Sequence, residues 1–367
     1  MPIFTAEQLR QVVQGCLQAV AVPEEEAALT ARLMVEANLT GHDTHGVRQA
    51  PRYVGLIEQG VIAAGAPVEV VRETPTTAVL DAHFNLGFVG ATRAAELAIA
   101  KCRAMKLSAV GVRNLNHVGR VGAYPELVAA AGLIALVFVN GQGRGVLVTP
   151  FGGLAPRLGT NPVGAAFPNP KGPPILLDFA TSAVAANKVR QVKSRGQPAG
   201  AGWLVRPDGT PTTEPQDFID GAAMLLPLGG GQGHKGYALG VMVDLLSGVL
   251  AGSGTAMTKP RDLNNGTFII CIDPEVFLER SEYEAQVSAY VDYLHDTPTR
   301  PGDPPVQVPG EFEARNRAAR LEAGIALEPP VWDDVAACAR RLGVTVPEPL
   351  PAAKPGPVPA PVPRARG

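Results

Sequence analysis

Cysteine is scarce in this sequence of 367 residues and never occurs in a close pair. The four cysteines lie far apart along the chain, without a CxxC motif: Cys16, Cys102, Cys271 and Cys338. Zinc knots and dithiol redox motifs need close spacing, and disulfide frameworks are typical of short secreted chains. The sequence disfavours all of these sites, so we expect four buried, reduced thiols and no bound metal.

The sequence also lacks a long apolar segment and an excess of charge of either sign. The longest apolar run, residues 133–139, has the length of a strand, whereas a membrane helix needs about 20 residues. Lysine and arginine number 32 against 34 aspartates and glutamates, without a basic stripe. These patterns argue against a membrane span and against nucleic acid as a partner. The N-terminus does not read as a signal peptide, so we expect a cytoplasmic protein.

Two common phosphate-binding patterns are missing. The dinucleotide-binding pattern GxGxxG is absent, because two runs have only GxGxG: Gly141, Gly143 and Gly145, then Gly229, Gly231 and Gly233. A P-loop is absent as well, since His234 precedes Lys235 where that motif requires glycine. Any phosphate site must therefore rely on the free amides at a helix N-terminus.

The residues that are present predict a mixed α/β protein of two or three packed domains. A capping box formed by Thr5 and Gln8 predicts the start of a first helix, and Pro23 before three glutamates predicts a second that stops at Gly41. Further helices are predicted at residues 87–106, about 121–131, 237–250, 311–322 and 331–342, and strands at 107–112, 133–139, 174–179 and 267–272.

The proline-rich C-terminus differs from the rest of the chain. Residues 347–367 contain eight prolines, mixed mainly with alanine, valine and glycine. Such a composition has few backbone donors and no periodic apolar face. We therefore expect a disordered tail over residues 346–367.

Candidate chemistry gathers on loops that carry histidine. His45 is close in sequence to Asp43, which can orient an imidazole, and to Arg48, whose guanidinium can hold a carboxylate at two points. Dehydrogenation of a 2-hydroxy acid needs a fixed carboxylate and a group that exchanges the hydroxyl proton. From spacing alone, a helix-end loop with solvated charges is an equally good interpretation.

Three other segments carry polar groups at element ends. His117 follows a predicted strand and is a rival acid or base. His234 and Lys235 open a predicted helix, where an anion is favoured, although a structural turn is nearly as plausible. Residues 178–182 end a strand with a carboxylate and two hydroxyls, which suits a ribose or an amide but also a helix cap.

Taken in order, these segments resemble the second, non-Rossmann type of malate/L-lactate dehydrogenase family. The match covers almost the whole chain before the tail, and six ordered motifs are more specific than any single one. They are Asp43-Thr44-His45-Gly46-Val47-Arg48 with Pro51 and Tyr53, Asn116-His117-Val118-Gly119, Gly159-Thr160-Asn161-Pro162, Leu177-Asp178-Phe179-Ala180-Thr181-Ser182, His234-Lys235-Gly236, and Pro309-Gly310-Glu311.

The resemblance implies a homodimer with a non-Rossmann NAD(P)-binding fold and a site near the subunit interface. It implies a helical domain from both chain ends (1–65 and 311–345), a mixed α/β substrate-side region (66–125 and 265–310) and a cofactor-binding region (126–264). The cofactor is then NAD or NADP, and the substrate a small 2-hydroxy or 2-keto acid.

The resemblance also implies roles for single residues. The acid/base falls on His45, the carboxylate-binding arginine on Arg48 and a second active-site histidine on His117, with Thr44 beside them. The cofactor-binding positions are Thr160, Asn161, Asp178, Phe179, Ala180, Thr181, Ser182, His234, Lys235, Gly310 and Glu311.

Three departures from the family's pattern accompany this resemblance. Thr44 stands where serine is usual, Val118 where an aromatic residue is frequent, and Asn187 where glycine normally precedes Lys188. Three other functions stay open: reduction of a cyclic ketimine such as Δ1-piperideine-2-carboxylate, a catalytically silent homologue, and a metal-dependent hydrolase using histidines and Asp43.

Overall fold

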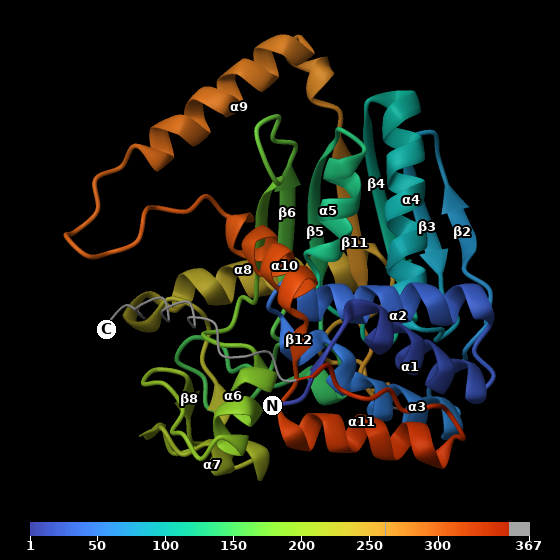
Figure 1. Cartoon of the computed structure of the whole chain (residues 1–367). Coiled ribbons are helices and arrows are strands. Elements are labelled where there is room, and N and C mark those ends of the chain that lie inside the picture. Colours follow the sequence, from blue (N-terminus) through green and yellow to red (C-terminus); the bar gives the residue numbers. More distant parts are fainter. Residues whose placement is uncertain (261, 352–367) are drawn as a thin grey trace.

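The computed structural model describes residues 1–260 and 262–351, and its centre is a mixed sheet (Figure 1). In this sheet β3 and β4 pair in parallel, and all other neighbouring strands pair antiparallel. Strand β11 comes much later in the sequence than β4 and β5, but it lies between them and pairs with both. The mixed α/β class expected from the sequence is confirmed. The order across the sheet is β2 (Glu69–Glu73), β3 (Thr77–Asp81), β4 (Leu107–Arg113), β11 (Thr267–Ile272), β5 (Ile134–Val139), β6 (Val163–Phe167) and β7 (Ile175–Phe179).

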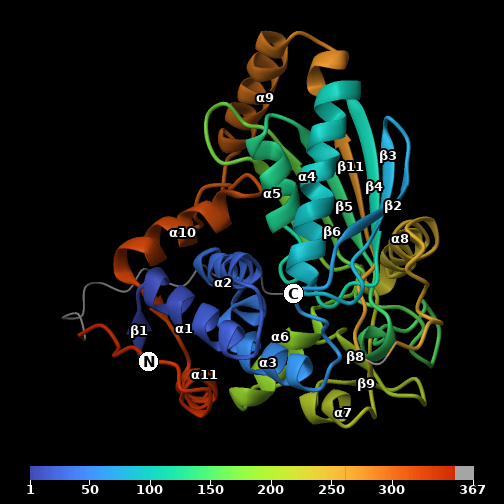
Figure 2. The same cartoon turned by 90° about the vertical axis from the view of Figure 1, so that its right-hand side faces the viewer.

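Alternate residues of the strands bury the two faces of this sheet against different helices. Ile269 and Cys271 pack toward α4 (Gly87–Met105) and α5 (Ala123–Ala130). Phe268 packs on the opposite face, toward α8 (His234–Asp244) and the π-helical turn η5 (Leu245–Leu250) that continues it. Figure 2 shows α4 and α5 on one side of the sheet and α8 on the other.

Helices from both ends of the chain share one hydrophobic core beneath the sheet (Figure 1). The Thr5–Gln8 capping box forms as expected, and the Phe4 and Trp332 rings pack with centroids 4.0 Å apart. Short strands β1 (Ile3–Phe4) and β12 (Ile325–Ala326) pair beside them. The helices are α1 (Ala6–Ala19), α2 (Glu24–Leu39), α3 (Ala50–Glu58) and α11 (Pro329–Arg341), with α10 (Glu311–Ala323) lying against α2.

A small third region and a projecting helix complete the chain. The region contains α6 (Ala186–Ser194), α7 (Pro215–Ile219) and a three-stranded sheet of β8 (Leu204–Val205), β9 (Pro211–Thr212) and β10 (Met224–Leu225). Helix α9 (Arg280–His295) extends away from the body in Figure 1. Within residues 1–260 and 262–351, no helix is both long and apolar enough to cross a membrane.

Most of the elements expected from the sequence form, with small differences. The helix expected at 237–250 begins at His234 and changes to π-helix after Asp244. The sequence patterns did not reveal α3, α6, α9, β2, β3 or β6. All four cysteines are buried and free, as expected.

The segment expected to be disordered from residue 346 onward lies partly within the described structure. The Glu348 carbonyl accepts from the Gln8 amide at 3.0 Å, and the Leu350 amide donates to the Ile3 carbonyl at 2.7 Å. The remainder of the expected tail, residues 352–367, lies outside the described residues.

Candidate active site

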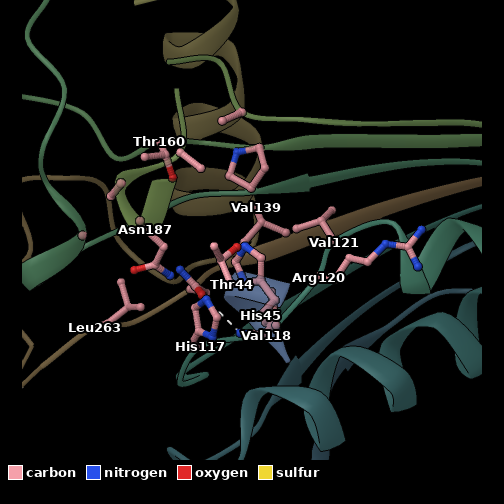
Figure 3. A pocket seen from close by; sticks show the side chains of 18 of the residues that line it. Thr44, His45, His117, Val118, Arg120, Val121, Val139, Thr160, Asn187 and Leu263 are labelled. Atoms are coloured by element: carbon pink, nitrogen blue, oxygen red, sulfur yellow. Dashed lines mark hydrogen bonds between the residues drawn. The ribbon is translucent and has the colours of Figure 1, made fainter. Parts of the chain in front are cut away.

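A cavity of about 590 Å³ lies where the loop after α2, the loop after β4 and the start of α6 meet (Figure 3). In this view Asn187 and Leu263 line one side, and Val121 and Arg120 the other. Eight of the predicted site residues line it: Thr44, His45, Arg48, His117, Thr160, Asp178, Phe179 and Ala180.

The loop after α2 forms two short 3-10 turns, η1 (Asp43–His45) and η2 (Val47–Gln49), that aim His45 and Arg48 at the cavity. The buried Asn38 side chain fixes the loop by accepting from the Val47 amide at 2.9 Å. A side chain at Gly46 would collide with the Asn38 amide, so this position requires glycine.

Asp43 anchors this loop to the C-terminal helix α10. Its carboxylate accepts from both terminal nitrogens of Arg320, at 2.7 and 3.1 Å, and from the Asn38 amide at 2.7 Å. The expectation that Asp43 orients His45 is therefore wrong, because the Asp43 oxygens are engaged on the other side of the loop. Asp43 therefore links the loop to α10 and α2 and makes no hydrogen bond to the His45 ring among the described residues.

The two predicted active-site histidines meet in the cavity. The rings of His45 and His117 stack with centroids 5.3 Å apart and planes within 9° of parallel. The buried Tyr53 hydroxyl lies 2.5 Å from His117 Nδ1. The buried Nδ1 atom of His45, by contrast, has no hydrogen-bond partner among the described residues. His117 is thus held by a specific contact, and His45 by stacking.

Burial keeps both histidines uncharged at neutral pH. It lowers the pKa of His45 to about 4, although nearby Asp178 acts in the opposite direction. Burial, followed by the charges of His45 and Arg52, lowers the pKa of His117 well below the usual value. Burial also raises the pKa of Tyr53, so its hydroxyl keeps its proton. A neutral imidazole has one donor and one acceptor nitrogen, which suits reversible proton exchange.

The arginines at the cavity differ in their partners. Arg120 is buried and paired with Glu126 at 2.9 Å and with Asp178 at 3.5 Å. Figure 3 shows its guanidinium directed away from His45. Arg48, in contrast, has no carboxylate within ion-pair distance in the described part of the chain. Arg48 is therefore available for an anionic ligand.

The remaining predicted cofactor positions do not line this cavity. Asn161, Thr181 and Ser182 are buried behind it, where their side chains bond to backbone groups. His234 and Lys235 are exposed at the start of α8. Gly310 and Glu311 begin α10, where Glu311 bonds His295 and the Val308 amide.

Sequence reasoning named neither Arg52 nor Arg190, which line the cavity, and it gave no role to Tyr53, which it had noted only as a motif residue. Arg52 lies four residues after Arg48, a helical spacing that could have indicated a shared face. The contact between Tyr53 and His117 joins residues 64 positions apart and has no local signal. Arg190 lies on α6, which the sequence patterns did not reveal.

Metal-ligating side chains are not grouped here. In residues 1–260 and 262–351, no three histidine, cysteine, aspartate or glutamate side chains come together as a metal-binding group. His42, one of the ligands that the hydrolase interpretation would use, lies 3.1 Å from Glu313.

Comparison with known proteins places these features in a family. Residues 4–336 match the family described as malate/L-lactate dehydrogenase. The chain is 38% identical over 343 residues to an L-lactate dehydrogenase of Cupriavidus necator, covering 92% of this chain and 97% of the relative.

Two solved structures are similar in fold and sequence. A malate dehydrogenase from Entamoeba histolytica matches with a TM-score of 0.90 and 27% identity, over 94% of this chain and 99% of that one. A Δ1-piperideine-2-carboxylate reductase from Pseudomonas syringae matches with a TM-score of 0.82 and 27% identity, over 92% and 100% of the two chains.

Proposed function

The chain belongs to the malate/L-lactate dehydrogenase family, and from that premise we propose that it transfers hydride between NAD or NADP and carbon 2 of a small 2-hydroxy or 2-keto acid. The observation that carries the proposal is the meeting of two neutral, stacked histidines with an arginine that has no carboxylate partner in the described residues. A proton carrier and a carboxylate anchor are the two protein groups that this reaction requires.

The residues present fit a nicotinamide cofactor. Ala180 and three glycines, Gly119, Gly141 and Gly145, line the cavity and leave its walls open to a flat ring. The volume of about 590 Å³ lies in the range of small-ligand sites. We propose that Thr160 and residues 178–180 hold the nicotinamide end, and the cofactor supplies or accepts the hydride when bound.

We propose Arg48 as the anchor of the substrate carboxylate. Its planar guanidinium forms two parallel hydrogen bonds to a carboxylate, which fixes the orientation of carbon 2 as well as its position. Thr44, beside it in the cavity, offers a hydroxyl at the same wall.

We propose that His117 exchanges the proton on the substrate's 2-oxygen. The Tyr53 hydroxyl contacts Nδ1 of His117, so Nε2 of the same ring is left for the substrate. Because a hydroxyl can both donate and accept a hydrogen bond, this contact is compatible with both directions of the reaction. The sequence analysis gave this role to His45 and a polarising role to His117. The hydrogen bonds favour the reverse assignment, with His45 polarising the same oxygen from the stacked ring.

An activity assay tests the function. The purified chain is given pyruvate or oxaloacetate with NADH or NADPH, and oxidation of the cofactor is followed by its absorbance. We expect turnover with at least one acid and one cofactor. Cofactor binding is measured separately by fluorescence. If NADH or NADPH binds but neither a keto acid nor a cyclic ketimine is turned over, the chain is a catalytically silent homologue.

Reduction of a cyclic ketimine is the second candidate, because the chain resembles the Pseudomonas syringae reductase over almost its full length. An imine nitrogen also needs a proton, which His45 or Asp178 would supply. Turnover of Δ1-piperideine-2-carboxylate that exceeds turnover of both keto acids would favour this alternative.

We also keep the wider expectations as proposals. These are a cytoplasmic homodimer with its site near the subunit interface, a non-Rossmann cofactor fold and the domain division given above. His234 and Lys235 would meet the cofactor phosphates at the start of α8. Light scattering on the purified chain measures the oligomeric state directly.

A further inference from the structure

Positive charge exceeds negative charge on one side of the cavity. Arg48 and Arg52 are four residues apart on the continuous segment of η2 and α3, and both line the cavity. Arg190 lines it from α6. Three guanidinium groups from two separate elements therefore face one space.

Arg190 has no acidic partner in the described part of the chain. Its Nη1 donates to Asn187 Oδ1 at 3.0 Å, and its guanidinium carbon lies 5.8 Å from the centre of the Phe218 ring. The Arg190 side chain is exposed overall, but partial burial of its guanidinium, and then the charges of Arg52 and Arg48, lower its pKa. The three arginines are thus close enough to repel one another, and neither of the Arg190 contacts offsets that repulsion.

The carboxylates nearby do not neutralise this group. Asp262 accepts from Arg52 at 3.1 Å, and its other oxygen lies 3.5 Å from Arg144, so one carboxylate serves two arginines. Asp178 is paired with Arg120. If the substrate had only one carboxylate, held by Arg48, the positive charge of Arg190 on α6 would have no negative partner in the cavity.

We propose that the substrate carries a second anionic group, which Arg190 binds together with Arg52 while Arg48 holds the 2-carboxylate. The preferred substrates are then dianionic 2-hydroxy or 2-keto acids, such as dicarboxylates or sulfonated carboxylates, over monoanions of the lactate type. This inference rests on the proposed function and deepens it. Arg52 and His117 line the same cavity, so an anion on Arg52 would lie in the space where the 2-oxygen reacts.

The first test compares substrates at saturating cofactor. We expect kcat/KM for oxaloacetate or 3-sulfopyruvate to exceed that for pyruvate by about tenfold or more, the effect of one charged hydrogen bond. Oxaloacetate and 3-sulfopyruvate separate a carboxylate from a sulfonate as the second group. Equal or higher kcat/KM for pyruvate overturns the inference and leaves the proposed function intact.

The second test removes the charge with Arg190→Gln. We expect the ratio of kcat/KM between dianion and pyruvate to fall about tenfold. The matched control is Arg195→Gln at the end of the same helix, where Arg195 pairs with Glu328 at 2.5 Å away from the cavity lining. An unchanged ratio with a raised KM for the cofactor would assign Arg190 to a cofactor phosphate and overturn the inference.

A binding measurement separates this inference from the proposed function. Calorimetry with succinate and with propionate needs no turnover, and we expect succinate to bind more tightly in the wild type but not in Arg190→Gln. If succinate binding depends on Arg190 but no keto acid is turned over, the result supports the dianion site and contradicts the proposed reaction. Equal affinity for the two acids would overturn the dianion site.

Discussion

The cavity has two walls that differ in how firmly they are held. The helical wall, residues 42–53, rests on the core shared by both chain ends, and its Val47 and Tyr53 side chains are buried. The α6 wall, residues 185–190, buries one side chain completely, Val189, and meets solvent at Arg190. Groups that must be positioned for proton transfer benefit from a rigid support, whereas groups that select a substrate can lie on a more open one. The comparison therefore places proton transfer at the helical wall, and the selection of a second anion at the exposed Arg52 and Arg190 side chains, one on each wall.

The largest expected effect follows from His117, which the helical wall holds through Tyr53. His117→Asn should lower kcat by about a hundredfold or more, because the proton on the 2-oxygen loses its carrier. His45→Asn should have the smaller effect. Steady-state kinetics measure both, with His83→Asn, a surface histidine paired with Glu69, as the control. A larger loss in His45→Asn would return the acid/base role to His45.

The second effect concerns the stability of the helical wall in acid. Folded His45 takes up a proton only near pH 4, whereas an unfolded histidine does so near pH 6.5. The free energy of unfolding should therefore be unaffected by this group above about pH 6.5 and fall by up to ~3 kcal/mol as the pH drops to about 4. Urea unfolding at several pH values measures the fall. His45→Asn should show a shallower fall, and identical curves would contradict the prediction.

The third effect tests the carboxylate anchor. Arg48→Lys keeps the charge but loses the two-point contact, so KM for the keto acid should rise roughly tenfold while kcat changes less. Cofactor affinity, measured by fluorescence titration, serves as the internal control. A fall in kcat with constant KM would mean that Arg48 acts on the transition state instead of on binding.

The last prediction compares the loss of stability caused by one small substitution on each wall. Asn187 lies in the first turn of α6, where glycine is not needed for the backbone, so Asn187→Gly should destabilise the protein by no more than ~0.5 kcal/mol. Gly46→Ala on the helical wall should cost about 2 kcal/mol, because the new methyl group meets Asn38. Urea midpoints of the two variants measure the difference, and similar losses would remove the distinction between the walls.

Local signals in the sequence predicted the elements whose cause is local. The capping box at Thr5 and the apolar strand at residues 267–272 depend on neighbouring residues, and both form as expected. Strand β2 is exposed along its whole length and helix α9 buries only Tyr283 and Val291, so neither has the apolar face that reveals such elements.

The parts of the site that sequence reasoning missed depend on contacts between distant residues. Asp43 and Arg320 are 277 positions apart, and Tyr53 and His117 are 64 apart. No spacing rule predicts such pairs, since they arise only when elements far apart in the sequence pack against one another. The loop motif predicted that His45 and Arg48 meet at one cavity, but the partners that hold them came from tertiary structure.

The shared core of the two chain ends has a consequence for how the protein is made. Phe4 is synthesised 328 residues before its ring partner Trp332. At about 5–20 residues per second, the N-terminal helices of a nascent chain wait roughly 15 to 65 seconds for that partner. The ion pair between Arg320 and Asp43 likewise forms only after residue 320 has been synthesised. A nascent chain therefore contains strands β2–β7 before Arg320 is present to hold the loop that carries His45 and Arg48.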